Sequence, residues 1–445
     1  MSQRTRILAE IWGYRGWKVT DVAFERDGVA VKPVAGVVPP EAAIILHVER
    51  RWTARCAHCD AIGGRLHERL PTRRWRDLDW AGRPAFIEYA PVRVHCSRCD
   101  ARAVERLAWA DPHQRQSRRF QQRLALVAAS APVSHVAALY DLDWGTVRRA
   151  EGHALARWDR TRTPPPLRHL GIDEKYLGRR NALPYDYVTI FSNVETGEPV
   201  AIRAGRGEAT VAAFLGSLCA AQKASIVLVV MDLHAPFRAA IRNDPAMAHA
   251  VVVHDPFHVL KRATEAVTEM RRATFFRAGA AMRAVGRGTR WLVLRAWEKC
   301  SAEERAQLRR LFTHNGKLAR AYQIVEELRA TLRAPSREAM VQGLARIKRR
   351  TEKRSNPALR GLHDSLERHR EGILALGEHR PRAGRVEALN NNWETLVRRG
   401  RGYRDHEYLL LKLKFATATP IRNEDTARRF LELDLTPRSS RRRAA

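Results

Sequence analysis

The chain has 445 residues, of which 80 are Lys or Arg and 48 are Asp or Glu, so that its formal net charge is +32. Hydrophobic residues make up 45% of it, which is enough to bury real cores and excludes wholesale disorder; at roughly 100 to 200 residues per domain we expect two to four domains. The excess of positive charge excludes a neutral housekeeping enzyme and indicates a polyanionic partner. Nucleic acid is the leading candidate, because an arginine fork donates two hydrogen bonds to one phosphate.

Targeting signals and disulfides are not expected. The start, MSQRTRILAEIWGYRG, lacks the apolar core of a signal peptide, and no apolar run approaches the roughly 18 residues that span a bilayer. We therefore expect a soluble, intracellular protein. Six cysteines in a chain of this length do not make a disulfide framework, and two of them, Cys219 and Cys300, stand alone in apolar contexts that predict buried thiols.

The first hundred residues predict a β-rich region. Residues 1–50 give a short helix and then a hairpin around Asp27-Gly28, and a second pair of alternating stretches surrounds Ala81-Gly82. Two C-x2-C pairs, Cys56/Cys59 and Cys96/Cys99, flank this second hairpin. The spacing within each pair lets both thiolates reach one tetrahedral ion, so the four cysteines predict a closed structural zinc site. His58 and His95 are alternative ligands, and reduced thiols or a redox pair are the other interpretations.

From Ser117 to about Trp158 the hydrophobic period becomes helical, with breaks near Pro132 and at 141–143, which predicts three short helices. The last two form a helix-turn-helix, with Ser134 and Asp143 as expected N-caps. Because the start of the second helix enters the major groove in such motifs, we expect it to bind DNA. The expected contacts are Thr146, Arg148 and Arg149. A plain three-helix packing unit is the alternative.

After TRTPPPLRH the pattern changes to three strands, GIDEKYLG, YDYVTIFSNV and PVAIRAG, followed by helix, strand, helix and strand. That order is the order of an RNase H-like fold, in which the first and fourth strands are neighbours and parallel. Asp173 lies within the first strand and Asp232 ends the fourth, so their carboxylates should meet and bind two magnesium ions about 4 Å apart. Asp255 ends the next apolar strand and is the competitor for the second acid.

Alternation along the first strand places Lys175 on the face of Asp173 and Glu174 on the opposite face. We therefore expect Lys175, and not Glu174, to contribute to the site, as a contact for DNA.

A third carboxylate is expected on a late helix. The stretch RVEALNNNWETLVRRGRGYR supplies Glu387, with Glu394 as the fallback. Three arginines around its two glycines are candidates for gripping a backbone phosphate, and a solvated basic face is the alternative: Arg398, Arg399 and Arg401. Between about Pro256 and Arg380 the period is only helical, so most of this stretch should be a domain inserted into the core.

These motifs, taken together, resemble the ISL3 family of bacterial insertion-sequence transposases. The resemblance covers nearly the whole chain and rests on CAHCD and HCSRCD, the helix-turn-helix, GIDEKY, VVMDLHAPF, VVVHDPFHVLKRATEAV and RVEALNNNWETLVRRGRGYR in the family's order. Leu233 and His234 follow Asp232 where the family usually has Met and a small residue. The resemblance implies a DDE transposase in which Asp173, Asp232 and Glu387 hold two Mg or Mn ions and cut and join DNA at the inverted-repeat ends.

The predicted fold class is a multidomain α/β protein whose RNase H-like core is interrupted by helices. The expected divisions are an N-terminal β unit with zinc at 1–110, the helix-turn-helix domain at 111–162, the core at 167–258, a helical insertion at 259–380, the final core helix at 381–420 and a basic, disordered tail at 421–445. Expected partners are double-stranded DNA and a second copy of the chain, in at least a dimer associated with the bacterial nucleoid. A DNA-binding regulator with inert acids and a structure-specific nuclease are the alternative functions.

Overall fold

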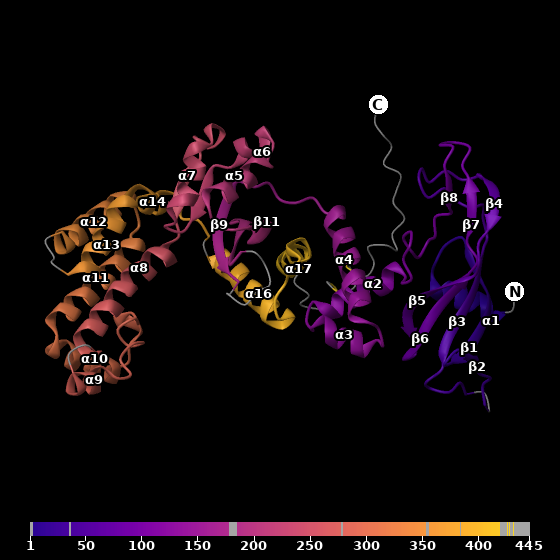
Figure 1. The fold of residues 1–445 in the computed structure, drawn as a ribbon, viewed down its shortest axis with the longest axis horizontal. Coiled ribbons are helices and arrows are strands. Elements are labelled where there is room, and N and C mark those ends of the chain that lie inside the picture. Colours follow the sequence, from indigo (N-terminus) through magenta and orange to yellow (C-terminus); the bar gives the residue numbers. More distant parts are fainter. Residues whose placement is uncertain are drawn as a thin grey trace. The chain divides into compact units, whose positions relative to one another are not determined.

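In a computed structural model the chain forms two compact units, one made of residues 1–163 with 419–445 and the other of residues 164–418. The structure describes residues 3–34, 37–177, 185–276, 279–352, 356–382 and 384–418, together with residues 425, 427 and 430. Figure 1 follows the chain from the β-rich start to the last helices. Among the described residues, no helix combines the length and the apolar content that crossing a membrane would require.

The first unit begins with a helix and two sheets. A five-stranded sheet has the order β2-β1-β3-β6-β5, in which β3 and β6 are parallel, and a three-stranded antiparallel sheet has the order β4-β7-β8. The bounds are α1 Gln3–Trp12, β1 Trp17–Arg26, β2 Val29–Ala30, β3 Ala43–Arg50, β4 Arg65–Arg69, β5 Arg73–Trp80, β6 Arg83–Tyr89, β7 Val92–His95 and β8 Arg102–Val104. Both predicted hairpins are present, around Asp27-Gly28 and around Ala81-Gly82, where these four residues have positive φ.

Tryptophans fill the core between this large sheet and α1. Trp109 is fully buried, and its ring centroid lies 4.5 Å from that of Trp17, 5.6 Å from that of Trp12 and 5.8 Å from that of Trp75. Such edge-on aromatic packing adds to the free energy gained by burying the rings. The segment after β8 is thereby fixed to the sheet, and the helices that follow start from a rigid base.

Three helices complete the first unit: α2 Arg118–Ala128, α3 Val133–Leu139 and α4 Trp144–Thr161. They share a core that includes Phe120, Leu124, Val136 and Val147. The Asp143 carboxylate accepts a hydrogen bond from the N–H of Thr146 at 2.9 Å and caps α4, as predicted. The prediction for α3 was wrong, because its N-cap is Pro132 and Ser134 lies within the helix.

The second unit contains a five-stranded mixed sheet with the order β11-β10-β9-β12-β13. Strands β9 His169–Tyr176, β10 Tyr187–Asn193 and β11 Glu198–Ala204 form an antiparallel meander, and β12 Leu228–Met231 lies parallel to both β9 and β13 Val251–His254. The order follows from the sequence, since only short stretches of chain separate the first three strands, whereas a helix joins the last two.

Helices cover both faces of this sheet. On one face, α5 Glu208–Gly216 and α7 Ala235–Asn243 pack on alternate strand residues such as Leu170, Val229 and Met231. On the other face, α16 Gly384–Gly400 and α17 His406–Ala418 pack on Val188 and Ile190. Figure 1 shows this last pair, in yellow, beside β9 and β11, so that the end of the described chain returns to the sheet.

A group of helices separates β13 from α16. Their bounds are α8 Pro256–Arg271, α9 Ala280–Gly286, α10 Ala302–His314, α11 Gly316–Leu332, α12 Arg337–Thr351, α13 Pro357–Arg368, α14 Arg370–Leu374 and α15 Leu376–His379, with a π turn at Arg272–Phe276 and a 3-10 turn at Trp297–Lys299. Their core is continuous with Leu228, Val230 and Val253 of the sheet. As the sequence predicted, no strand occurs among the described residues between 256 and 380.

Several local predictions differ from the structure. The single helix expected at about 208–222 is broken into α5 and α6 Ala220–Ser225, and Cys219, expected to be buried, is exposed at the start of α6, whereas Cys300 is buried as predicted. A short 3-10 turn at Pro245–Met247 precedes β13. The final core helix is followed by a second one, α17, which the sequence pattern did not separate. The predicted disorder of the tail sequence, PRSSRRRAA, falls outside the described residues.

Candidate active site and nucleic-acid interface

Three aspartates lie in register on three neighbouring parallel strands: Asp173 within β9, and Asp232 and Asp255 directly after β12 and β13. In the sheet register Met231 of β12 is paired with Ile172 of β9 on one side and with His254 of β13 on the other. The next residue in each chain segment is an aspartate: Asp173, Asp232 and Asp255. Because parallel strands end at the same edge, the register alone brings these carboxylates to one place.

Each aspartate is oriented by a main-chain N–H group. The Asp173 carboxylate accepts a hydrogen bond from the N–H of its neighbour Glu174 at 2.9 Å, and the Asp232 carboxylate accepts one from the N–H of His234 at 2.9 Å. Asp255 accepts from Phe257 at 2.8 Å and is the N-cap of α8. Each of these bonds uses an Oδ1 atom, so the Oδ2 atoms are left for other partners.

Burial and neighbouring charges raise the pKa of two of these carboxylates. Burial is the largest effect raising the pKa of Asp232, and Glu174 raises it further. Burial also raises the pKa of Asp255, and the charges of Asp173 and Glu387 add to it. Carboxylates whose pKa is raised by burial and by neighbouring carboxylates form a site that a cation would stabilise.

Two basic side chains face the aspartates. Lys175 Nζ lies 3.0 Å from Asp173 Oδ2, which confirms that the two residues share a face of β9. His258, on the first turn of α8, has Nε2 4.0 Å from Asp173 Oδ1 and lowers the pKa of both Asp232 and Asp255. Glu174 lies on the other face, as predicted, 3.6 Å from Arg206. Its charge nevertheless acts on Asp232.

The third predicted acid, Glu387, lies in the first turn of α16 and is exposed. The buried face of the helix, Val386, Leu389, Trp393 and Leu396, packs on other elements, so Glu387 points away from the core. Its charge still acts on Asp255, whose pKa it helps to raise. The fallback, Glu394, is instead paired with Arg398 at 3.1 Å.

The start of α16 is fastened to the sheet by Arg385. Its guanidinium donates to the main-chain carbonyl of Glu195, in the turn between β10 and β11. Gly197 in the same turn has φ of +79°, and a Cβ atom there would lie 3.2 Å from Arg385 Cβ. A glycine therefore satisfies both the turn and the close approach of the helix. This contact fixes the start of α16, and with it the position of Glu387, relative to the sheet.

The acids fit a divalent metal by their chemistry, though they are not gathered as tightly as a metal cluster. Carboxylate oxygens are the ligands that magnesium and manganese prefer. Asp173 Oδ2 is buried and has only Lys175 Nζ beside it. Among the described residues, the only group of three or more potential ligands within 4.8 Å of one another is a set of four cysteines. The acids would therefore have to move closer together to share an ion.

That set is the one predicted from the C-x2-C spacing: Cys56, Cys59, Cys96 and Cys99. Cys56 Sγ lies 3.7 Å from Cys99 Sγ, and Cys59 Sγ lies 3.5 Å from Cys96 Sγ. A zinc tetrahedron with Zn–S bonds of about 2.3 Å has edges of roughly 3.8 Å, so the four thiols are spaced for zinc. The alternative ligand His95 is occupied instead, with Nε2 2.6 Å from Asp100.

The two cysteine turns have the same backbone geometry. In the first, the N–H of Asp60 donates to the carbonyl of Cys56, and in the second, the N–H of Asp100 donates to that of Cys96. Both aspartates have positive φ, 59° and 55°. Main-chain N–H groups of Cys99 and Arg98 lower the pKa of Cys96 to about 6, which favours the thiolate that zinc requires.

The predicted DNA contacts of the helix-turn-helix lie at the start of α4. Arg149 is exposed and its guanidinium donates to Thr146 Oγ1 at 3.3 Å, and Arg148 lies over the ring of Trp144, which is itself 55% exposed. Asp143, the residue directly before Trp144, is the N-cap of this helix. The start of α4 therefore carries an exposed arginine, Arg149, an exposed aromatic ring, Trp144, and a half-buried arginine, Arg148.

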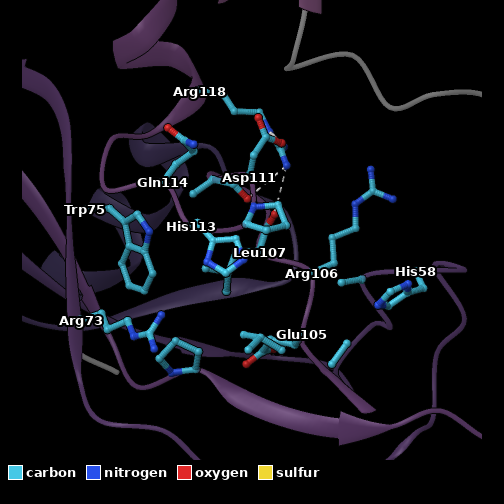
Figure 2. A pocket seen from close by; sticks show the side chains of 16 residues that line it. His58, Arg73, Trp75, Glu105, Arg106, Leu107, Asp111, His113, Gln114 and Arg118 are labelled. Carbon is cyan, nitrogen blue, oxygen red and sulfur yellow. Dashed lines mark hydrogen bonds and ion pairs between the residues drawn. The ribbon is translucent and has the colours of Figure 1, made fainter. Parts of the chain in front are cut away.

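A cavity of about 450 Å³ lies between the cysteine turns and the helices of the first unit. Figure 2 shows His58 and Arg106 on one side of it, His113 and Gln114 on another, and Trp75 and Arg73 along the sheet. The Asp111 carboxylate at its edge is held by Arg118 at 2.9 Å and by Arg157 at 3.0 Å. These ion pairs tie α2 and α4 to the segment that follows the cysteines.

The arginines after Glu387 have different surroundings. Arg398 is paired with Glu394, and Arg401 has a positive φ of 54° in the turn between α16 and α17. Arg399 also has an interaction partner. Arg398 and Arg401 are exposed, whereas Arg399 is half-buried, so the phosphate-gripping role predicted for the three remains a hypothesis.

Sequence reasoning ranked Asp255 below Asp232, because its strand lies one place further from β9, and it missed His258. The stretch HDPFH contained the signal: an aspartate after an apolar strand, a proline at the first helical position and a histidine three residues later, which returns to the same side of the new helix. The register shows that Asp255 is as close along the sheet edge to Asp232 as Asp173 is.

Comparison with known proteins agrees with the resemblance drawn from the motifs. Residues 170–413, more than half of the chain, match a family model described as a transposase of the DDE type, and residues 105–151 match the helix-turn-helix domain of transposase family ISL3. These matches define the class of the protein as a transposase. The chain belongs to the ISL3 family of transposases.

Two curated relatives are similar over most of their length. The transposase for insertion sequence element IS1001 of Bordetella parapertussis is 26% identical over 414 residues, which cover 92% of this chain and 98% of that protein. The transposase for insertion sequence element IS1557 of Mycobacterium tuberculosis is 26% identical over 421 residues, 88% of this chain and 90% of that protein. The similarity therefore includes both units.

Proposed function

We propose that this protein is a DDE transposase that binds the inverted-repeat ends of an insertion sequence and catalyses cleavage and strand transfer with Asp173, Asp232 and Glu387. The observation that carries the proposal is the sheet register, which sets Asp173 and Asp232 side by side, together with the charge of Glu387 acting at the same edge. The sheet order and the helices on both faces support an RNase H-like core.

We also propose that the core is divided along the chain. Residues 167–258 supply the strands, residues 259–380 form a helical insertion, and residues 381–420 return to the sheet. The packing of Leu389, Trp393 and Leu410 on Ile190 and Ile202 supports this division. The insertion would explain why the acids stand so far apart in sequence and yet belong to one site.

Two magnesium or manganese ions would be held by Asp173, Asp232 and Glu387, with Asp255 available as a further ligand; there they would activate the attacking oxygen and stabilise the leaving oxygen. The chain's own residues do the rest. Main-chain N–H groups hold one oxygen of each aspartate, and Lys175 pairs with Asp173 until substrate arrives. Water would first attack the phosphodiester at the element end, and the freed 3′ hydroxyl would then attack target DNA.

The first unit would recognise the ends. The helix-turn-helix would place Thr146, Arg148 and Arg149 in the major groove, while phosphate contacts fix the register. The four cysteines, holding one zinc ion, would stiffen the neighbouring sheet, and the basic side of the cavity beside them, Arg73 and Arg106, would face the DNA backbone. We propose that two such chains act together on two ends, in the cytoplasm of a bacterium.

The decisive experiment compares four substitutions in the full-length protein. Asp173→Asn, Asp232→Asn and Glu387→Gln should each abolish magnesium-dependent cleavage of end DNA, by a thousandfold or more in rate, and leave its binding intact. Asp364→Asn, on exposed α13, serves as the control and should cleave normally. If any of the first three variants still cleaves end DNA, that residue is not one of the catalytic acids.

Asp255→Asn distinguishes the two candidates for the second acid. If Asp232 is the acid and Asp255 mainly caps α8, the Asp255 variant should retain measurable cleavage because asparagine also caps helices. If instead Asp232→Asn cleaves and Asp255→Asn does not, the acids are Asp173, Asp255 and Glu387. A regulator with inert acids would show no cleavage in the native protein.

A further inference from the structure

A second cavity lies in the unit formed by residues 164–418, next to the proposed active site but outside it. Its volume is about 580 Å³. One wall is α7 and the outer edge of β13, and the other comes from the start of α12 and from α14 and α15. We call it the β13 groove. Since β13 is the last strand of the sheet, nothing in the sheet covers this edge.

Three arginines stand together in this groove: Arg238 and Arg242 on α7 and Arg368 at the end of α13. Arg238 Nη1 donates to the main-chain carbonyl of Arg368 at 3.0 Å, so the first and third are in contact. Burial lowers the pKa of the Arg238 guanidinium, and the charges of Arg242 and Arg368 lower it further. The cluster is therefore under mutual repulsion.

The acidic residues of the groove do not relieve this repulsion. Glu371 and Glu378 are paired with Arg337, at 2.6 Å and 3.4 Å, and Glu367 is paired with Lys348 at 3.2 Å. No carboxylate in the part of the chain that the structure describes is within ion-pair distance of Arg238, Arg242 or Arg368. Repelling arginines grouped in a cavity without counter-charges are the arrangement expected of an anion site.

The floor of the groove touches the strand end that carries Asp232. His254 and His369 are 2% and 5% exposed, and their rings meet at right angles with centroids 4.9 Å apart. His254 Nδ1 lies 2.9 Å from the main-chain oxygen of Asp232. Burial, and then His369, lower the pKa of His254 to about 4, so that it is a neutral donor to that oxygen.

The contact between the groove and Asp232 is close because Gly372 leaves room for it. A Cβ atom on Gly372 would lie 2.5 Å from His254 Cδ2, which no side chain permits without a shift. Helix α14 therefore packs directly on the histidine that holds the Asp232 main chain. The side chains of His254 and His369 would therefore separate a ligand in the groove from the proposed catalytic edge.

We propose that the β13 groove binds the phosphodiester backbone of a DNA strand, gripped by Arg238, Arg242 and Arg368, and that it leads this strand to the edge where Asp232 lies. Among the described residues the lining of this cavity contains no Phe, Tyr or Trp, and its guanidinium groups suit the charge of a phosphate. The direction toward Asp232 rests on the proposed function, whereas binding of the backbone does not.

The test measures how DNA affinity depends on salt. The double variant Arg242→Gln with Arg368→Gln is chosen because both residues are exposed and the side chain of neither makes a hydrogen bond or ion pair with another described residue, whereas Arg238 does. Full-length native protein and variant are titrated against a duplex carrying the element end, by fluorescence anisotropy at several salt concentrations. Two lost phosphate contacts should lower the salt slope by about 1.8, at roughly 0.9 each.

That change in slope has a measurable consequence. The affinity advantage of the native protein over the variant should shrink about tenfold as salt rises from about 50 to about 200 mM. The control with the same charge change, Arg287→Gln with Arg310→Gln, alters two exposed arginines of the helical segment and should leave the slope unchanged. A groove variant with the control's slope would overturn the proposal.

Two further arms separate the remaining explanations. Arg242→Lys with Arg368→Lys restores the charges and should restore the slope, whereas a folding defect caused by losing arginine would persist. If a poly-glutamate peptide, and not the duplex, loses affinity in the glutamine variant, the groove binds protein and the proposal is wrong. The result is independent of the catalytic assignment, because Asp173→Asn tests cleavage and leaves the salt slope untouched.

Discussion

Asp77 offers the sharpest test of how the first unit is held together. This carboxylate is fully buried on β5 and accepts hydrogen bonds from Ser117 Oγ at 2.6 Å, from Trp12 Nε1 at 3.2 Å and from the Arg119 guanidinium, whose Nε lies 2.7 Å away. Arg119 also donates to the main-chain carbonyl of Trp12. One acid thus joins α1, the large sheet and the first helix of the DNA-binding region.

We predict that Asp77→Ala destabilises this unit by about 3–5 kcal/mol, because it leaves Arg119 charged, mostly buried and without its partner. For a domain of this size each kcal/mol shifts the melting temperature by roughly 2–4 °C, so the expected shift is about 6–20 °C. Differential scanning calorimetry of the full-length protein, followed also by tryptophan fluorescence, measures it.

The control is Glu10→Ala, which breaks an exposed ion pair with Arg6 and should cost less than about 1 kcal/mol. A second variant separates the charge from the loss of shape: replacing both Asp77 and Arg119 by leucine should recover part of the stability, since it leaves no unpaired charge. If Asp77→Ala has the same melting temperature as the control, the acid does not organise the unit and the reasoning is wrong.

Three further predictions follow from the other contacts. Cys56→Ser with Cys59→Ser should reduce bound zinc from one ion per chain to none by elemental analysis and weaken end binding; native protein purified without zinc would contradict the site. Arg148→Ala with Arg149→Ala should lower affinity for end DNA and, if either reads a base, lower it more for the end than for unrelated duplex, in a competition titration; equal affinity for native and variant would exclude α4 from the interface. Trp393→Ala, which removes a side chain that is 4% exposed, should cost about 3–5 kcal/mol and reduce cleavage with it, because the same helix carries Glu387; normal cleavage in a destabilised variant would separate α16 from the site.

Much of the site was accessible from sequence because its geometry is local or follows from strand order. The two C-x2-C turns place their thiols by backbone conformation alone, and the four sulfur atoms are where the spacing predicted them. Lys175 shares a face with Asp173 because strands alternate. The Asp143 cap and the five-strand order followed from similarly short-range patterns.

What failed depended on packing. Cys219 stands in an apolar stretch, but the helix breaks just before it and leaves it exposed. Hydrophobic periodicity alone does not show which part of a helix faces solvent. The sequence placed the strand of Asp255 one position further from β9 than that of Asp232, and the sheet order agrees, but it did not show that the pKa of Asp255 responds to both Asp173 and Glu387. The β13 groove combines residues from several elements, and no linear motif contains it.

The sequence by itself singled out the candidate acids, the four clustered cysteines and the order of the strands, since these depend on residue type, short spacing and the connections between neighbouring elements. Only the tertiary structure decided which acids interact, where α16 returns to the sheet and which arginines gather without counter-charges. The reason is physical: carboxylates and guanidinium groups act through distance and burial, and both are set by helices that pack from remote parts of the chain.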